Sequence, residues 1–171
     1  MLTKNINFKN FLNIKNNKII KKDFLNLLKD PPPLFETLKS NYKYSYSKKA
    51  ISKYKKFSNI RVIGMGGSIL GTEAIYNFLK KKIKKKLSFI NNLNSNADYF
   101  QDKNINLNLI ISKSGNTLET IVNANILIKS RESNIVITED KESYLTNLAS
   151  KLKAEIFEHK NYVGGRYSVL S

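Results

Sequence analysis

IRVIGMGGSILG, residues 60–71, is the stretch of sequence that decides the fold. A short apolar run, Ile60–Gly64, leads into glycines and a serine, and a helical pattern follows over Leu70–Lys80. A buried strand that turns through glycines into a helix is typical of a parallel α/β sheet. The glycines allow close backbone approach, and Ser68 adds a hydroxyl where a helix N-terminus favours anions. The stretch predicts either a phosphate or polyol cradle or only a tight turn.

The same alternation continues along the chain. Thr117–Lys129 is predicted to be a helix, in which Leu118, Ile121, Val122 and Ile126 fall on one face. The further predicted strands are apolar runs at Leu87–Ile90, Leu107–Ser112, Asn134–Thr138 and Ala154–Phe157. Runs of this kind indicate a parallel sheet covered on both faces. We therefore expect a doubly wound α/β domain whose ligands lie beyond the carboxyl ends of the strands.

A second loop, SKSGNTLET at residues 112–120, also joins a predicted strand to a helix. Its small hydroxyl side chains surround a helix N-terminus, and Lys113 adds a positive charge, which suits a phosphate monoester. Ordinary helix capping by Asn116 or Thr117 is the alternative. Capping accounts for one hydroxyl but not for their density, so we favour a phosphate site.

A third segment, VGGRYSVLS at residues 163–171, places an arginine after two glycines. The flexible backbone could aim the Arg166 guanidinium into a cleft, where it would stabilise an oxyanion. A surface turn is the alternative.

Composition narrows the class of protein. The 171 residues are 41% hydrophobic and contain no cysteine, which excludes a disulfide framework and indicates a globular, cytoplasmic protein. Lysines interrupt the first residues, so we expect no signal peptide and no membrane span.

The net charge of +17 raises the question of nucleic-acid binding. Arginine, which nucleic-acid sites use for bidentate contacts, occurs only at positions 61, 131 and 166. We therefore interpret the lysine excess as compositional bias and expect no nucleic-acid partner. A lysine-rich binder acting through residues 1–86 remains an alternative.

Residues 1–57 are predicted to form a helical arm, and residues 58–171 the α/β domain. The prolines at 31–33 interrupt the arm. Its tyrosines at 42, 44, 46 and 54 could stack on single-stranded nucleic acid, but their irregular spacing favours packing on the main domain.

Together, GMGGSILG, SKSGNTLET and VGGRYSVLS resemble the glucose-6-phosphate isomerase family, which is built on sugar isomerase (SIS) domains of flavodoxin-like fold. The resemblance covers residues 60–171 and implies interconversion of glucose 6-phosphate and fructose 6-phosphate in glycolysis and gluconeogenesis. It implies a hexose 6-phosphate substrate, no cofactor, no metal and a homodimer of the full-length protein. The substrate-binding residues that it implies are Gly67, Ser68, Ser112, Lys113, Ser114 and Thr117.

The resemblance also implies that Arg166 stabilises the enediolate as a proton moves between C2 and C1. Such chemistry needs a carboxylate base as well as a trap for the oxygen. In the family, the glutamate base, the ring-opening histidine and a catalytic lysine lie nearer the C-terminus than this motif. We therefore expect an N-terminal portion with little activity of its own, or alternatively a non-catalytic module that binds a phosphosugar. His159 does not match the family's histidine motif and is expected to be solvent-exposed, and Glu119 is expected only to support the phosphate loop.

Overall fold

The computed structural model describes residues 17–93, 107–129 and 132–166. The chain groups into two compact units, Met1–Lys39 and Ser40–Ser171. The second unit contains both the sheet and the helix at Lys48–Ser52, which the sequence analysis assigned to the arm. The domain boundary between residues 57 and 58 stays a prediction.

The described part of the first unit, residues 17–39, contains two short helices. Helix α1 (Lys18–Lys29) begins at Asn17, whose side chain accepts hydrogen bonds from the amides of Ile19 and Ile20. Prolines follow α1, and one of them opens the 3₁₀ helix η1 (Pro33–Leu38), because proline needs no amide partner at a helix start. Within the described ranges, no helix has the length and apolar character needed to cross a bilayer.

The second unit is built on a five-stranded sheet in which every pairing is parallel. The strands are β1 (Asn59–Gly64), β2 (Lys86–Ile90), β3 (Leu107–Ile111), β4 (Ser133–Thr138) and β5 (Glu155–Glu158). Their order in the sheet is β2-β1-β3-β4-β5. The predicted doubly wound α/β fold is confirmed, with the strand ends within one residue of their expected positions.

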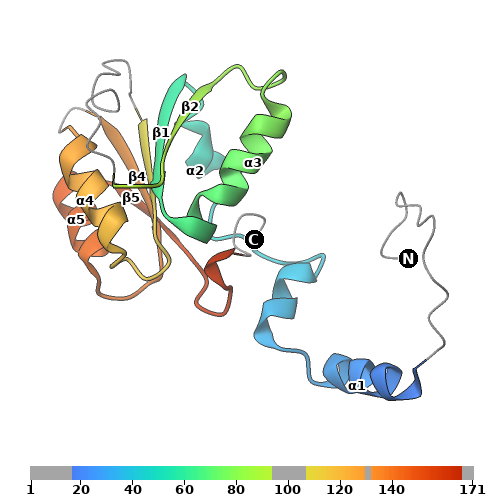
Figure 1. Ribbon diagram of the computed structural model, residues 1–171. Helices are drawn as coiled ribbons and strands as arrows, with labels where there is room; N and C mark the ends of the chain where they lie inside the picture. Colours follow the sequence, from blue (N-terminus) through green and yellow to red (C-terminus); the bar gives the residue numbers. More distant parts are fainter. Residues whose placement is uncertain (1–16, 94–106, 130–131, 167–171) are drawn as a thin grey trace. The chain divides into compact units, whose positions relative to one another are not determined.

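Helices cover both faces of this sheet. Helix α3 (Leu70–Leu79) lies on one face, and α4 (Leu118–Leu127) and α5 (Tyr144–Leu152) lie together on the other (Figure 1). This division follows from the strand order, because right-handed crossovers put connections that run in opposite directions on opposite faces. The short helix α2 (Lys48–Ser52) precedes β1.

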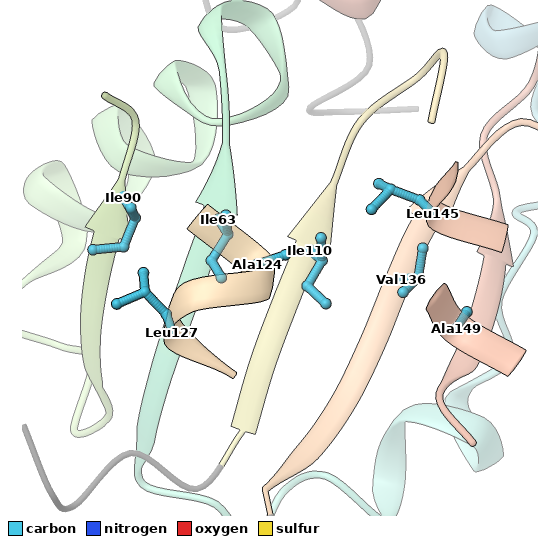
Figure 2. Packing of buried hydrophobic residues seen from close by; sticks show 8 residues of the cluster. All are labelled: Ile63, Ile90, Ile110, Ala124, Leu127, Val136, Leu145 and Ala149. Carbon is cyan, nitrogen blue, oxygen red and sulfur yellow. The ribbon is translucent and has the colours of Figure 1, made fainter. Parts of the chain in front are cut away.

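The main core lies between the sheet and the pair α4 and α5 (Figure 2). Ile63, Ile110 and Val136, from the three central strands, are fully buried there. Ala124 of α4 and Ala149 of α5 let the helices approach the sheet closely. Burial of this cluster fixes both helices against the strands.

Helix α4 turns a different face inward from the one that its large apolar residues suggested. Leu118 and Ile126 are exposed, at 65% and 57%. The residues that α4 buries are Thr120, Asn123, Ala124 and Leu127. Smaller side chains are used because the helix lies close to the sheet, and helical spacing alone could not identify this face.

The face that carries α3 has a smaller core and a hollow. Val62, Ile69 and Ile111 form the buried cluster there. A hollow of about 660 Å³ lies beside it, over the apolar side chains of β3, β4 and β5, and reaches Gly67 and Ser68. The glycine-rich loop after β1 therefore borders open space.

A buried polar network closes the amino end of the other face. Arg61 in β1 is 3% exposed, and its guanidinium donates to Asn108 Oδ1 (3.1 Å) and to the carbonyl of Leu127 at the end of α4 (2.9 Å). Asn108 donates in turn to Glu132 (2.9 Å) and Asn134 (2.9 Å). Arg61 and Glu132 lie 3.6 Å apart, and both side chains are at least nine-tenths buried. The network ties α4 and the start of β4 to β1 and β3.

Candidate functional site

The candidate site lies at the carboxyl edge of the sheet. The strand order reverses between β1 and β3, and residues 64–71 and 112–117 are the loops that follow these two strands. In open α/β sheets, ligands bind at such a reversal. A Cβ built on Gly64 would lie only 3.1 Å from the carbonyl of Ile111, so the two loops start close together.

The loop after β1 is a single 3₁₀ turn, Gly66–Ser68, that leads into α3. Gly66 has φ +54°, a left-handed conformation that favours glycine. The fully buried Ile69 anchors the turn, and no side chain caps α3. Helix α3 therefore begins two residues after Ser68, so its amino end is next to this turn.

The loop after β3 holds a pair of hydroxyl groups. Ser112 Oγ and Thr117 Oγ1 lie 2.8 Å apart, and the amide of Gly115 donates to Ser112 Oγ (3.2 Å). Ser112 is almost completely buried, whereas Ser114 is exposed. Thr117 therefore turns its hydroxyl toward the loop rather than onto the helix that it precedes.

Helix capping does not account for this loop. The Thr117 side chain makes no capping hydrogen bond at the amino end of α4, and Asn116 instead accepts a hydrogen bond from the amide of Tyr144, the first residue of α5 (2.8 Å). The buried hydroxyl of Thr120, in the first turn of α4, has no hydrogen-bond partner among the described residues. The amino end of α4 thus presents amides next to a hydroxyl pair, an arrangement suited to an anion.

Gly115 fixes the shape of the same loop. It has φ +71°, and a Cβ at this position would lie 2.2 Å from Ser143 Oγ and 2.9 Å from Thr138 Oγ1. Only glycine fits here without a shift. The carbonyl of Gly115 accepts from the amide of Leu145 (3.1 Å), so the loop is attached to the start of α5.

Lys113, which was expected to add positive charge to the loop, is itself bound to protein groups. Its ammonium group donates to the carbonyl of Asn161 (2.8 Å) and lies 3.5 Å from Glu139. Hydrogen bonding to Lys141 lowers the pKa of Glu139, and Lys113 adds to this effect. The loops after β3, β4 and β5 are therefore linked by charged groups.

The third segment reaches the first by backbone contact. A Cβ on Gly67 would lie 2.5 Å from Cα and 2.6 Å from N of Arg166, so these backbones pack against each other. Val163, three residues before Arg166, is 1% exposed and anchors the segment. Arg166 itself is exposed, and the remainder of the motif, residues 167–171, lies outside the described residues. The structure thus brings all three sequence segments to one edge of the sheet.

His159 is buried, so the expectation of solvent exposure was wrong. It is 8% exposed, and its amide donates to the carbonyl of Thr138 (2.7 Å), which extends the pairing of β5 with β4. Its Nδ1 lies 2.9 Å from the carbonyl of Lys160, and Nε2 has no partner among the described residues. Pairing of this segment with β4 buries His159 although the charged Lys160 follows it.

Burial makes His159 a source of acid sensitivity. Desolvation lowers the pKa of its imidazole below 6.5, and the nearby Lys113 acts in the same direction, although the Lys160 carbonyl and Glu139 oppose them. The unfolded chain therefore binds this proton more tightly than the folded chain. Above about pH 6.5 His159 does not lower the free energy of unfolding, and below that pH it lowers it progressively as the pH decreases.

We expect His159→Leu to reduce the loss of stability between pH 7.5 and pH 5, by up to about 1.4 kcal/mol for each unit by which the pKa is lowered. Urea unfolding of both proteins at the two pH values measures the difference. If the free energy of unfolding of both proteins changes with pH in the same way, folding does not change the pKa of His159.

Metal ligands are not grouped in the described part of the chain, where no three His, Asp or Glu side chains are close enough to hold one ion. The polar groups of the site are instead hydroxyls, backbone amides, Lys113 and Arg166. These are groups that bind and neutralise anions.

Known proteins are similar to this chain in sequence. The model of the family "Phosphoglucose isomerase" matches residues 13–171. Glucose-6-phosphate isomerase of Methanocaldococcus jannaschii is 41% identical over 135 residues, which are 71% of this chain and 33% of that protein. The enzyme of the same name from Borrelia garinii subsp. bavariensis is 36% identical over 134 residues, 68% of this chain and 25% of that protein. The chain spans about a quarter to a third of the length of these relatives.

Solved structures share the fold at lower identity. A hypothetical protein from Thermus thermophilus has a TM-score of 0.70 at 20% identity, and the match covers 90% of this chain and 41% of that protein. Tagatose-6-phosphate ketose/aldose isomerase from Escherichia coli has a TM-score of 0.54 at 17% identity, and the match covers 87% and 41%. The sequence matches, supported by the shared fold, establish that the chain belongs to the phosphoglucose isomerase family.

Proposed function

We propose that the protein interconverts glucose 6-phosphate and fructose 6-phosphate, and that residues 1–171 supply its phosphate-binding loops and one catalytic arginine. The observation that carries the proposal is the convergence of residues 64–68, 112–117 and 163–166 at the reversal of strand order. Family membership supports the reaction, and the cytoplasmic location and homodimer expected for the full-length protein stay predictions.

The substrate phosphate would bind at the amino end of α4. The hydroxyls of Ser112, Ser114 and Thr117 and the amides of the first turn would hold its oxygens, and Lys113 adds positive charge nearby. A phosphate oxygen could replace the contact between the Ser112 and Thr117 hydroxyls. Gly67 and Ser68 would contact the sugar, because the glycine loop borders the hollow.

Arg166 would act on the reacting carbons. Isomerisation moves a proton between C2 and C1 and leaves negative charge on oxygen in the enediolate. A guanidinium held at that oxygen stabilises the charge as it develops. Glu119 lies in the first turn of α4, where a carboxylate supports the helix, so we propose that the proton-transferring base comes from outside these residues.

Amide shifts during titration with fructose 6-phosphate test the binding site. In full-length protein labelled with ¹⁵N at glycine and serine, we expect resonances from both 64–68 and 112–115 to move. Fructose without phosphate is the control and should leave 112–115 unperturbed at the same concentration. A response confined to one loop would contradict a common site.

A coupled assay tests the reaction separately. Interconversion of the two hexose phosphates by the full-length protein supports the isomerase. Binding at both loops without turnover would favour the alternative, a non-catalytic phosphosugar module.

A further inference from the structure

Lys113 joins two loops that belong to different strands. Its Nζ lies 2.8 Å from the carbonyl oxygen of Asn161, in the loop after β5, and 3.5 Å from Glu139 at the end of β4. Only 31% of the Lys113 side chain is exposed. The ammonium group therefore donates to one protein carbonyl and forms an ion pair with one protein carboxylate.

The backbone of Lys113 is held as firmly as its side chain. Its carbonyl accepts from the amide of Glu139 (3.1 Å) and from Thr138 Oγ1 (3.4 Å). The residue is thus fixed to the end of β4 at its main chain and to the loop after β5 at its ammonium group. Motion of Asn161 relative to the phosphate loop would break one of these contacts.

Asn161 begins the segment that carries the proposed catalytic arginine. Among the contacts that hold the described part of this segment, Lys113 holds Asn161, burial holds Val163, and backbone packing on Gly67 holds Arg166. The first of these is the one that comes from the phosphate loop. Loss of the Lys113 contact would remove this link between the phosphate loop and the residues ahead of Val163.

We infer that Lys113 is a positioning residue that acts through Arg166, by holding residues 161–166 in place relative to the phosphate loop. The inference rests on the proposed function and adds a second role to the charge of Lys113. A phosphate ligand contributes to binding in the ground state, so its loss raises KM and weakens inhibition by inorganic phosphate. A residue that positions the arginine contributes mainly in the transition state, so its loss lowers kcat.

Kinetics of the full-length protein separate these roles. We expect Lys113→Met to lower kcat about tenfold or more, in addition to the higher KM and weaker inhibition by inorganic phosphate that follow from removing a charge near the phosphate. Lys113→Arg, which keeps a donor and the charge, should restore most of kcat. Lys141→Met is the matched control, because the Lys141 ammonium also pairs with Glu139 but does not hold the carbonyl of Asn161, and it should retain kcat within about twofold.

A double-mutant cycle shows whether Lys113 acts through the arginine. We expect Lys113→Met to have no further effect on kcat in an Arg166→Ala background, since the two residues would act as one unit. Multiplicative losses would overturn the inference. So would a Lys113→Met protein that keeps its kcat and loses inhibition by phosphate, because that result makes Lys113 a phosphate ligand alone.

Amide hydrogen exchange tests the contact without substrate. The amides of residues 161–165 should exchange about tenfold faster or more in Lys113→Met than in Lys141→Met. Equal exchange would overturn the inference even in an active isomerase. Faster exchange in a protein without isomerase activity would support the contact between Lys113 and Asn161 but contradict the proposed function.

Discussion

Replacing Arg61 with methionine is expected to lower the free energy of unfolding by about 3–5 kcal/mol, a large part of the stability of an ordinary domain. The substitution leaves the Glu132 carboxylate buried without its cation, and it removes the donor to Asn108 and to the Leu127 carbonyl. Burying an uncompensated charge costs more than the ion pair itself contributes.

Urea unfolding of Arg61→Met measures this loss. Lys39→Met is the control, because it breaks an ion pair with Glu36 whose side chains are both about half exposed, and it should cost less than about 1 kcal/mol. The double variant Arg61→Met/Glu132→Gln should recover part of the stability, since no buried charge is then left alone. A loss below about 1 kcal/mol in Arg61→Met would mean that water reaches the network.

In the proposed isomerase, replacing Gly67 with alanine is expected to lower kcat about a hundredfold. The new methyl would lie 2.5 Å from Arg166 Cα, whereas carbon atoms in contact lie about 3.5–4.0 Å apart, so one backbone must move by about 1 Å. A displacement of that size at a catalytic group can cost about a hundredfold in rate.

Gly165→Ala is the matched control for Gly67→Ala. It adds the same methyl one residue from Arg166, but the built Cβ meets nothing within 4 Å. We expect it to keep kcat within a few-fold. Equal losses in the two variants would show that added bulk anywhere in this segment is harmful, and unchanged kcat in Gly67→Ala would show that the contact with Arg166 does not position the guanidinium.

The strands were predictable because a parallel sheet is buried on both faces. Such a strand must be apolar along its whole length, as Leu107–Ile111 is apart from Asn108, and this pattern needs no knowledge of its neighbours. Helix α5 also had a readable signal that the sequence analysis left unused: Ser143 before leucines and an alanine at helical spacing. Ser143 and Thr146 do form a capping box there.

Other features depended on the fold and could not be predicted. The two glycine-containing loops could be recognised from the sequence as connections from a strand to a helix. Their glycines and hydroxyl residues directly follow an apolar run, so no knowledge of distant contacts was needed. The partner of Lys113 is a backbone carbonyl 48 residues away, and every residue of the chain offers an identical group. The charged Arg61 inside an apolar strand was a visible anomaly, but its partners became apparent only when the register aligned it with Asn108.

The place of β1 inside the sheet also has a consequence for synthesis on the ribosome. β1 pairs with β2 on one side and β3 on the other, and β3 is made last of the three. At typical rates of translation, about 1–4 s separate the appearance of Ile90 from that of Ile111. During that interval the inner edge of β1 has no partner strand, and an open, apolar strand edge is a template for pairing with other chains. Slower translation between the codons for β2 and β3 would therefore lengthen the period in which the nascent polypeptide can aggregate.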